Sequence, residues 1–410
     1  MRQNIGNAKG DRKGKRTPPS VMTLVLMAGT SVLAMNVFLP MLPEIARELN
    51  TTPAIAQSVL TLFLATTAVS QLIIGPASDR FGRRPVILVC CVIFILATIV
   101  CLAATSIEML LFGRVLQATS AANIALSRAI IRDLYDREKA ASMIGYVTMA
   151  MAVIPMIGPA AGGIIGEMFG WRGPFGLLLI TGVFILIVVY FDVGETHTPV
   201  RSPVGERFRD YGSLLKEPLI WGYIGSSTLS SGAYFAFLGG APFVGETLMG
   251  LEPAELGAYF ALVALGYMFG NYLSGRYSQA VGLEPMMAYG GIVAAAGMVL
   301  ALYLMTFHEP QALFLFGPMM FVGIGNGMSL PNANAGAVSV RPDLAGSASG
   351  LAGFMQIGGG AALAALSGML ITEANQGMPL YIIMFVSSVA GAAIAGLMYI
   401  AMRRGAKMGA

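Results

Sequence analysis

The sequence predicts an all-α integral membrane protein with twelve transmembrane helices in two six-helix halves. Three observations support this fold class: an apolar composition, long apolar runs that recur along the chain, and an uneven placement of Lys and Arg. Hydrophobic residues make up 56% of the 410 residues and charged residues only 11%, whereas about 25% of the residues in a soluble domain are charged. Backbone groups in lipid must be hydrogen-bonded within their own segment, so long apolar runs predict helices rather than strands.

Each apolar run is roughly 20 residues long, which is enough for a helix to cross the hydrocarbon core of a bilayer. The longest polar gap divides the runs six and six. We therefore expect transmembrane helices at residues 20–41, 54–76, 85–105, 107–130, 140–166, 173–192, 218–242, 254–276, 286–306, 311–332, 344–372 and 379–402.

Lys and Arg cluster in alternate gaps between these runs. Six lie in the amino-terminal tail, three follow the second run, four lie around the gap between the fourth and fifth runs, and four lie in the central gap. The intervening gaps hold only Arg47 and Arg172. Because positive charge is retained on the cytoplasmic side, both termini are expected in the cytoplasm.

A polar loop is expected to join the two halves. The predicted organisation is a basic cytoplasmic tail at 1–19, a first half at 20–192, a cytoplasmic central loop at 193–217, a second half at 218–402 and a cytoplasmic tail at 403–410. Arg132-Asp133-Leu134 precedes the fifth run and Arg341-Pro342-Asp343-Leu344 precedes the eleventh, as an internal repeat predicts. The basic tail could belong to a cleaved signal peptide, but a retained signal anchor is expected because no convincing cleavage site follows.

The stretch GPASDRFGRRP, residues 75–85, concentrates charge between the second and third runs. Gly82 permits a tight turn, and Pro85 suits the first position of the next helix. Gly75 lets a neighbouring helix approach closely, and Asp79 can face the positive N-terminal end of another helix. A simple basic loop would account for the arginines but not for the spacing of Gly75, Asp79 and Gly82.

This pattern, G-x-x-x-D-R-x-G-R-R after the second of twelve helices, resembles the cytoplasmic loop motif of the major facilitator superfamily at every position. In that family the motif latches the two halves on the cytoplasmic side while the transporter opens outward. The resemblance therefore implies a conformational latch whose counterpart is the eleventh helix. The latch residues would be Gly75, Asp79, Arg80, Gly82, Arg83, Arg84, Asp133 and Asp343.

A second motif lies in the fifth run. The pattern P-x-x-G-P-x-x-G-G resembles one found in exporters of this superfamily, and its residues are Pro155, Gly158, Pro159, Gly162 and Gly163. Proline and paired glycines bend a helix and let it pack tightly. The alternative is a generic glycine-rich membrane helix.

Further matches narrow the resemblance to one branch. The fourth run carries R-x-x-Q-A at residues 114–118, similar to the family's R-x-x-Q-G but with Ala118 in place of glycine. Together with Leu39-Pro40-Met-Leu-Pro43 and Pro331-Asn332-Ala-Asn334, the chain resembles the bicyclomycin and chloramphenicol resistance (Bcr/CflA) branch. The resemblance covers nearly the whole chain except residues 1–19. It implies a multi-pass protein of the bacterial cytoplasmic (inner) membrane.

Arg114 lies roughly 10 Å along its helix inside the hydrocarbon region. A charged residue there is a functional candidate, because its burial must be offset by partners or a water-filled cavity. The alternative is that Arg114 reaches the outer face with Glu108 as partner. Residues expected at a central substrate cavity are Asn36, Arg114, Gln117, Asn123, Tyr234, Asn326 and Gln356, and for each the alternative is a satisfied contact between helices.

The first run departs from the branch in one position. Relatives tend to carry an aspartate before Ile/Met-Tyr-Leu-Pro, taken as a proton carrier, whereas this chain reads Asn36-Val-Phe-Leu-Pro40. An amide cannot titrate. The favoured function is a secondary exporter of small lipophilic drugs that works by alternating access as a proton antiporter. The alternative is an exporter or facilitator of one specific metabolite with weak or no proton coupling.

Other classes of function lack their signals in this sequence. There is no nucleotide-binding P-loop, and the three cysteines, Cys90, Cys91 and Cys101, lie in one apolar run without ligand partners at metal spacing. We expect no enzyme activity, no cofactor, no metal and no nucleic-acid partner. The expected partners are a small-molecule substrate, protons and the lipid bilayer, and the chain is expected to be a monomer.

Overall fold

The computed structural model describes residues 19–135, 143–144, 147, 151, 153–196, 211–309, 311–341, 344–375 and 377–408. Asp343 of the expected latch, most of the amino-terminal tail and much of the central loop lie outside these residues. The described part of the chain is helical and contains no strand.

The first half of the described chain runs from α1 to α9. Its helices are α1 (Val21–Asn36), α2 (Leu42–Glu48), α3 (Pro53–Phe81), α4 (Arg83–Leu102), α5 (Ile107–Gln117), α6 (Ala121–Leu134), α8 (Ile154–Phe169) and α9 (Arg172–Asp192). The first and fourth spans are each interrupted by a short 3₁₀ turn, η1 (Leu39–Met41) and η2 (Ala118–Ser120). In the first span Pro40 and Pro43 lack the N–H that a continuous helix needs, which places the interruption there.

The second half consists of longer helices. They are α11 (Pro218–Met249), α12 (Pro253–Val281), α13 (Leu283–Phe307), α14 (Ala312–Val340), α15 (Ala345–Leu370) and α16 (Met378–Met408), with the 3₁₀ turn η4 (Glu373–Asn375) before α16. Among the described residues, ten stretches are long and apolar enough to cross a membrane. The two remaining spans are α8, with 16 residues, and α11, whose buried serines lower its hydropathy. The twelve-helix fold class is confirmed.

In each half, the second and third spans are joined by a turn with the same backbone conformation. α3 and α12 each have 29 residues and begin with a proline, Pro53 and Pro253. Each ends at a glycine with positive φ: Gly82 at φ 96° and ψ 153°, and Gly282 at φ 98° and ψ 161°. Only glycine adopts this backbone region without strain. The halves are therefore structural repeats. The shared turn geometry is stronger evidence for the repeat than the sequence similarity around Asp133 and Asp343.

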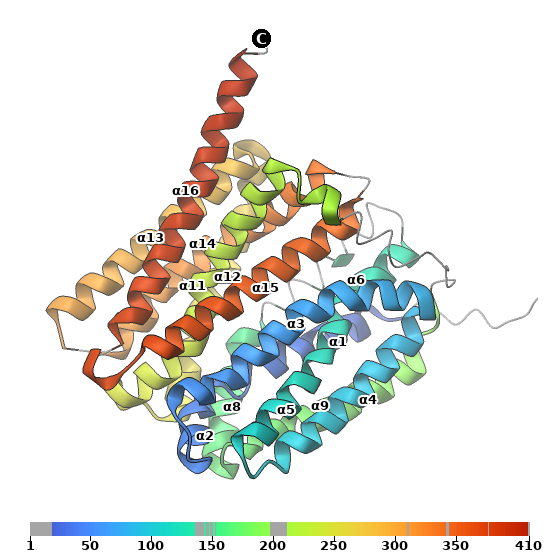
Figure 1. The fold of residues 1–410 in the computed structure, drawn as a ribbon, viewed down its shortest axis with the longest axis vertical. Coiled ribbons are helices and arrows are strands. Elements are labelled where there is room, and N and C mark those ends of the chain that lie inside the picture. The colour runs from blue at the N-terminus through green and yellow to red at the C-terminus, as the bar shows by residue number, and fades with distance from the viewer. Residues whose placement is uncertain are drawn as a thin grey trace, which may run out of the picture.

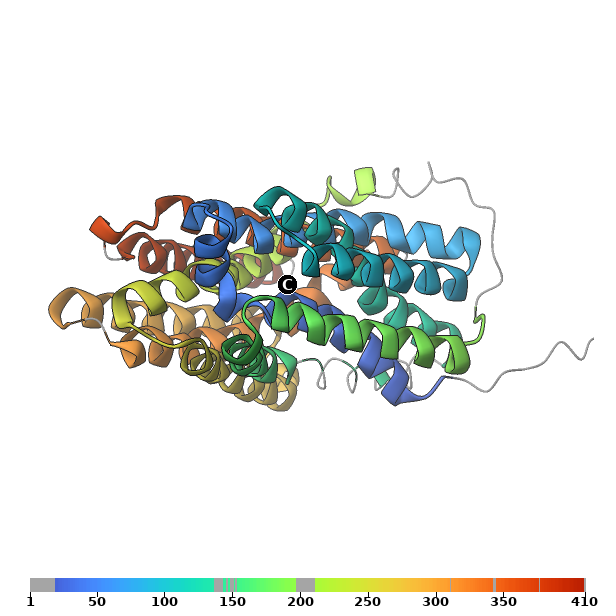
Figure 2. The ribbon, with the colours of Figure 1, turned by 90° about the horizontal axis from the view of Figure 1, so that it is seen from below.

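The two halves lie side by side and meet along two helix pairs. α3 packs against α15, and α8 packs against α12 (Figure 1). Seen from below, the helices of the second half gather to the left and those of the first half to the right (Figure 2). We call the end with the α3–α4 turn the motif end, and the end with α2 and the α11–α12 turn the far end.

The apolar cores differ between these two ends. Toward the far end one cluster of buried side chains includes residues of both halves, among them Phe38, Leu60, Phe237 and Leu256. Toward the motif end each half has a separate cluster, one around Ile87 and Ile130 and the other around Tyr223 and Ala337. Among the described residues, the halves therefore share an apolar core only toward the far end.

Candidate functional site

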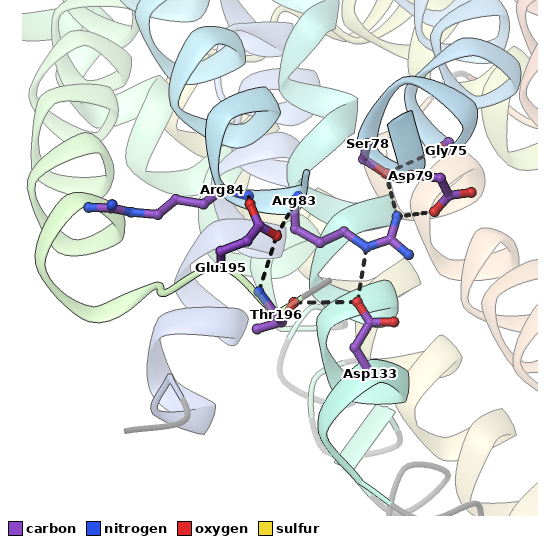
Figure 3. A network of polar contacts seen from close by, with 8 residues as sticks. All are labelled: Gly75, Ser78, Asp79, Arg83, Arg84, Asp133, Glu195 and Thr196. Atoms are coloured by element: carbon purple, nitrogen blue, oxygen red, sulfur yellow. Dashed lines mark hydrogen bonds and ion pairs between the residues drawn. The ribbon is translucent and has the colours of Figure 1, made fainter. Parts of the chain in front are cut away.

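Arg83 joins two carboxylates at the motif end. Its Nη1 lies 2.6 Å from Asp79 Oδ1, and its Nε lies 3.0 Å from Asp133 Oδ2 (Figure 3). Nη1 also donates a hydrogen bond to Ser78 Oγ at 2.5 Å. Arg83 is only 7% exposed, so these charge-assisted bonds are less screened than those of surface pairs. The end of α3, the start of α4 and the end of α6 are thereby tied together.

Glu195 completes this network from the segment that follows α9. Its carboxylate accepts hydrogen bonds from the backbone N–H groups of Arg83 and Arg84, at 2.9 and 3.3 Å (Figure 3). These N–H groups begin α4 and have no acceptor within the helix, and a negative charge there also interacts favourably with the helix dipole. Thr196 Oγ1 donates to Asp133 Oδ2 at 3.3 Å. We call the turn between α3 and α4, with its arginines, the charged turn. Glu195 caps the start of α4 in this turn, although the sequence pattern gave no indication of it.

The remaining latch candidates surround this network. The Gly75 carbonyl accepts from Ser78 Oγ at 2.8 Å, and Arg84 Nη2 donates to the Tyr190 carbonyl at 2.9 Å. A Cβ on Gly82 would overlap the Glu195 carboxylate. Arg80 is exposed and lies over the Phe81 ring, with 5.4 Å to the ring centroid. The contact expected with Asp343 remains a prediction because that residue lies outside the described chain.

Gly163, the last glycine of the P-x-x-G-P-x-x-G-G motif in the fifth span, lies at the contact between the halves. A Cβ on Gly163 in α8 would overlap the carbonyl oxygen of Pro253 in α12. One turn away, a Cβ on Gly257 of α12 would overlap the carbonyl oxygen of Pro159 in α8. The two backbones therefore approach each other directly, as small residues allow in membrane packing.

The other motif residues in α8 face the first half and the space between the halves. A Cβ on Gly162 would overlap the Val37 carbonyl oxygen, and one on Gly158 would meet Leu33 Cδ1 at 3.4 Å. Pro155 faces a central cavity. The motif thus lets one helix contact both the first span of its own half and α12 of the other half.

The central cavity has a volume of about 240 Å³ and is bounded by both halves. α1, α6 and α8 contribute from the first half, and α11, α12, α14 and α15 from the second. Three predicted cavity residues line it: Tyr234, Asn326 and Gln356. Its walls are otherwise mostly apolar, which is typical of small-molecule sites.

Arg114 lies away from this cavity, inside the first half. Its side chain is fully buried, with the guanidinium 4.2 Å from the ring centroids of both Phe38 and Phe63. Nε donates to the Val59 carbonyl at 3.0 Å, and Nη1 donates to the Ala34 carbonyl at 3.0 Å and to Gln117 Oε1 at 2.7 Å. The alternative that Arg114 reaches the outer face beside Glu108 is therefore wrong. Arg114 joins three spans of the first half to each other.

The other three polar candidates of the first half are also buried in helix contacts and do not line the cavity. Asn36 Nδ2 donates to the Val32 carbonyl at 2.7 Å, and Gln117 Nε2 donates to Thr98 Oγ1 at 2.8 Å. Asn123 Oδ1 accepts from Cys91 Sγ at 3.8 Å. The interpretation as a satisfied contact between helices fits Gln117 and Asn123, whereas Asn36 bonds within its own helix and its Oδ1 has no partner among the described residues. A part of all three in substrate binding remains a prediction.

Two ionisable residues that line the cavity, Arg128 and Tyr267, were not among the predicted cavity residues. Arg128 falls inside the run predicted at 107–130, but its charge was assigned to the following loop. Its place within an apolar run was the signal that could have identified it. Nothing in the sequence pattern distinguishes Tyr267 from other aromatic residues of the spans.

Polar contacts also cross between the halves at the far end. Arg47 of α2 forms an ion pair with Glu246 of α11. Glu167 Oε1 at the end of α8 accepts from the Ala254 backbone N–H, in the first turn of α12, at 2.9 Å. These contacts join the two halves at the far end, next to the apolar core that the halves share.

This fold, with a cavity between two repeated halves, defines the class of polytopic membrane transporters that work at a site between their repeats. Residues 24–364 match the model of the Major Facilitator Superfamily, and the chain belongs to that superfamily.

Similar proteins span most of the chain. Multidrug resistance protein D of Escherichia coli (strain K12) is 30% identical over 87% of this chain and 90% of its own. The bicyclomycin resistance protein homolog of Haemophilus influenzae is 28% identical over 84% of this chain and 88% of its own. The crystal structure of a D-xylose–proton symporter has a TM-score of 0.72 at 18% identity, covering 92% of this chain and 96% of that one, and shows the shared fold.

Proposed function

We propose that the chain is a secondary active transporter, and not an enzyme, that exports small lipophilic drugs and antibiotics across the bacterial cytoplasmic membrane. The observation that carries this proposal is the apolar cavity bounded by helices of both halves. A site between two repeats can be exposed to one side at a time when one repeat rocks against the other. The names of the relatives, which refer to multidrug and bicyclomycin resistance, support drugs as the substrate class.

The motif end faces the cytoplasm in this proposal, and the transporter works as a monomer. α1 begins and α16 ends at the motif end, so both termini are cytoplasmic, in agreement with the placement of Lys and Arg. The contacts at the far end then close the cavity toward the outside. In this proposal, the arrangement with a closed far end accepts substrate from the cytoplasm.

The charged turn is proposed to bias the balance between the two openings. The equivalent turn of the second half has the same glycine geometry at Gly282 and the same proline spacing at Pro285, but Leu283 and Glu284 replace the two arginines. Backbone geometry alone therefore does not require Arg83 and Arg84. The charges serve a further role, for which a latch between the halves is the best account.

Proton antiport is the proposed energy source, and the alternative is export of one specific metabolite with weak or no proton coupling. A specific observation favours the alternative: among the described residues that line the cavity, none is Asp or Glu. Coupling in the favoured proposal would then use a carboxylate outside the cavity, such as Asp79 or Asp133.

The test is export of a panel of antibiotics and dyes from an efflux-deficient host, with and without a protonophore. Arg276→Gln is a matched surface control, because Arg276 is exposed and lies outside the cavity. Lower accumulation of several chemically different compounds, abolished by the protonophore, supports the favoured proposal. Export of a single compound that survives the protonophore supports the alternative, and no export of any compound contradicts both.

A further inference from the structure

We infer that the central cavity selects lipophilic compounds that carry one anionic group, and that Arg128 is the residue that binds this group. The inference rests on the proposed export function and names the substrate class of the same cavity. Arg128 lies on α6, five residues before Asp133, so along the helix it is roughly 8 Å from the charged turn. Its side chain is only partly buried and lines the cavity.

The guanidinium of Arg128 has no counter-ion in the described part of the chain. No ion pair or hydrogen bond to it is formed there, and the lining residues described include no carboxylate. Tyr267 lies across the cavity on α12, and Arg132 lies one turn along α6. Arg132 is a like charge and increases the positive potential at this position. A charged side chain within a membrane span requires a partner, and here a ligand can supply it.

Comparison with Arg114 in the same span shows why Arg128 differs. The Arg114 guanidinium donates to two carbonyls and to Gln117, and aromatic rings cover both of its faces. Arg114 is fully buried and has no room for a ligand. Arg128 instead is only partly buried and lines the cavity.

The rest of the lining determines which anions fit. A guanidinium presents a planar pair of donors that matches a carboxylate or sulfonate. Met35, Phe235 and Phe260 provide apolar surface for the body of the ligand. A cationic compound would meet a like charge with no carboxylate to offset it, so the cavity discriminates against cations.

The test uses three probes of one size and shape: 2-naphthoate, 2-naphthamide and 2-naphthylmethylammonium. Their binding to the purified full-length protein in detergent is measured by equilibrium dialysis, with free probe read by naphthyl fluorescence. We expect the wild type to bind naphthoate about tenfold more tightly than naphthamide, as for a charge-assisted hydrogen bond, and the ammonium most weakly. Arg128→Gln should remove this preference, and Arg128→Lys, which keeps the charge but lacks the planar pair of donors, should retain only part of it.

Arg276→Gln is the control for net charge, since it removes an exposed arginine outside the cavity. A melting curve for each variant identifies loss of folding, and the Lys variant keeps the test decisive if Arg128→Gln does not fold. Equal binding of naphthoate and naphthamide by the wild type overturns the inference, as does a preference that persists in Arg128→Gln. Export of neutral drugs by the wild type together with either result leaves the proposed function standing and removes only the anion selectivity.

Discussion

Arg83 Nε lies 3.0 Å from Asp133 Oδ2, although the two residues are 50 positions apart in the chain. The same guanidinium also binds Asp79, so one arginine pairs with two carboxylates that come from the second and fourth spans. A single change in this network alters contacts among three helices of one half. These contacts all lie within the first half, so an effect of the network on the balance between two arrangements of the halves remains a prediction.

We expect Asp79→Asn to lower transport about tenfold while leaving membrane insertion intact. An amide keeps the size of the side chain but removes the charge that faces Arg83, and a change of about 1.4 kcal/mol shifts a two-state balance tenfold. Initial rates of dye export, normalised to the amount of protein in the membrane, measure this effect. Glu309→Gln is the matched control, because Glu309 is an exposed carboxylate at the opposite end of the molecule. Wild-type rates in Asp79→Asn would contradict the latch.

Gly163→Ala should open the far end. The added methyl group would overlap the Pro253 carbonyl oxygen, so α8 and α12 must separate. Crosslinking between cysteines introduced by Arg47→Cys and Glu246→Cys reports closure, and its yield should fall several-fold in Gly163→Ala. In Gly176→Ala the yield should be unchanged, since a Cβ at Gly176 meets no atom within 4 Å. Unchanged crosslinking in both variants would show that this close contact does not hold the far end closed.

The ion pair between Arg47 and Glu246 should matter less than this backbone contact. Its side chains are 66% and 28% exposed, and exposed pairs contribute about 1 kcal/mol at most. Arg47→Glu should therefore lower the export rate by about fivefold or less, and adding Glu246→Arg should restore it. The measurement is dye export at low and at high salt. If Arg47→Glu lowers the rate of dye export more than Gly163→Ala does, the ion pair matters more than the backbone contact and this prediction is wrong.

Arg114→Ala should destabilise the protein as well as reduce transport. Removing the side chain leaves the acceptors at Val59, Ala34 and Gln117 without a donor and creates a void between Phe38 and Phe63, at a cost of several kcal/mol. Arg114→Lys should rescue poorly, because one ammonium cannot replace the planar fork of donors. Thermal unfolding in detergent is the measurement. A melting temperature equal to that of the wild type would contradict this role.

Hydropathy and charge placement were sufficient to predict the fold, because each span must be apolar and the positive residues must remain on one side. The turn at Gly82 was predictable from its glycine and proline spacing. The partners of that turn were not, since the contact of Arg83 with Glu195 depends on how α9 ends rather than on a local pattern. Arg47 and Glu246 are 199 positions apart and meet only because the halves close at the far end.

The rotation of each helix about its axis was the main information that the sequence lacked. The serine-rich helix α11 has no clear polar face, so its pattern does not show which side points to the cavity. Arg114 and Arg128 lie in the same predicted span, yet only Arg128 faces the cavity. The 3₁₀ turn η2 lies between them.

Asn36 provides a test of proton coupling. It is fully buried, and its Nδ2 donates to the Val32 carbonyl at 2.7 Å, while its Oδ1 has no partner among the described residues. In Asn36→Asp, a protonated carboxyl could reproduce the bond to Val32, whereas an ionised one would place a negative charge against that carbonyl. The variant should therefore bind a proton in the state seen here and release it when the site opens to water, which is the linkage that an antiporter needs.

Because Asn36 cannot titrate, the alternative with weak proton coupling predicts that export by the wild type in proteoliposomes depends only modestly on an imposed pH gradient and that Asn36→Asp steepens this dependence. Asn36→Leu is the matched control, because leucine has a similar size and cannot titrate. Initial export rates are measured at several values of the pH gradient with the membrane potential clamped. If the wild type drives steep uphill export and Asn36→Asp leaves it unchanged, the coupling group lies elsewhere, and Asp79 and Asp133 at the charged turn become the residues to replace next.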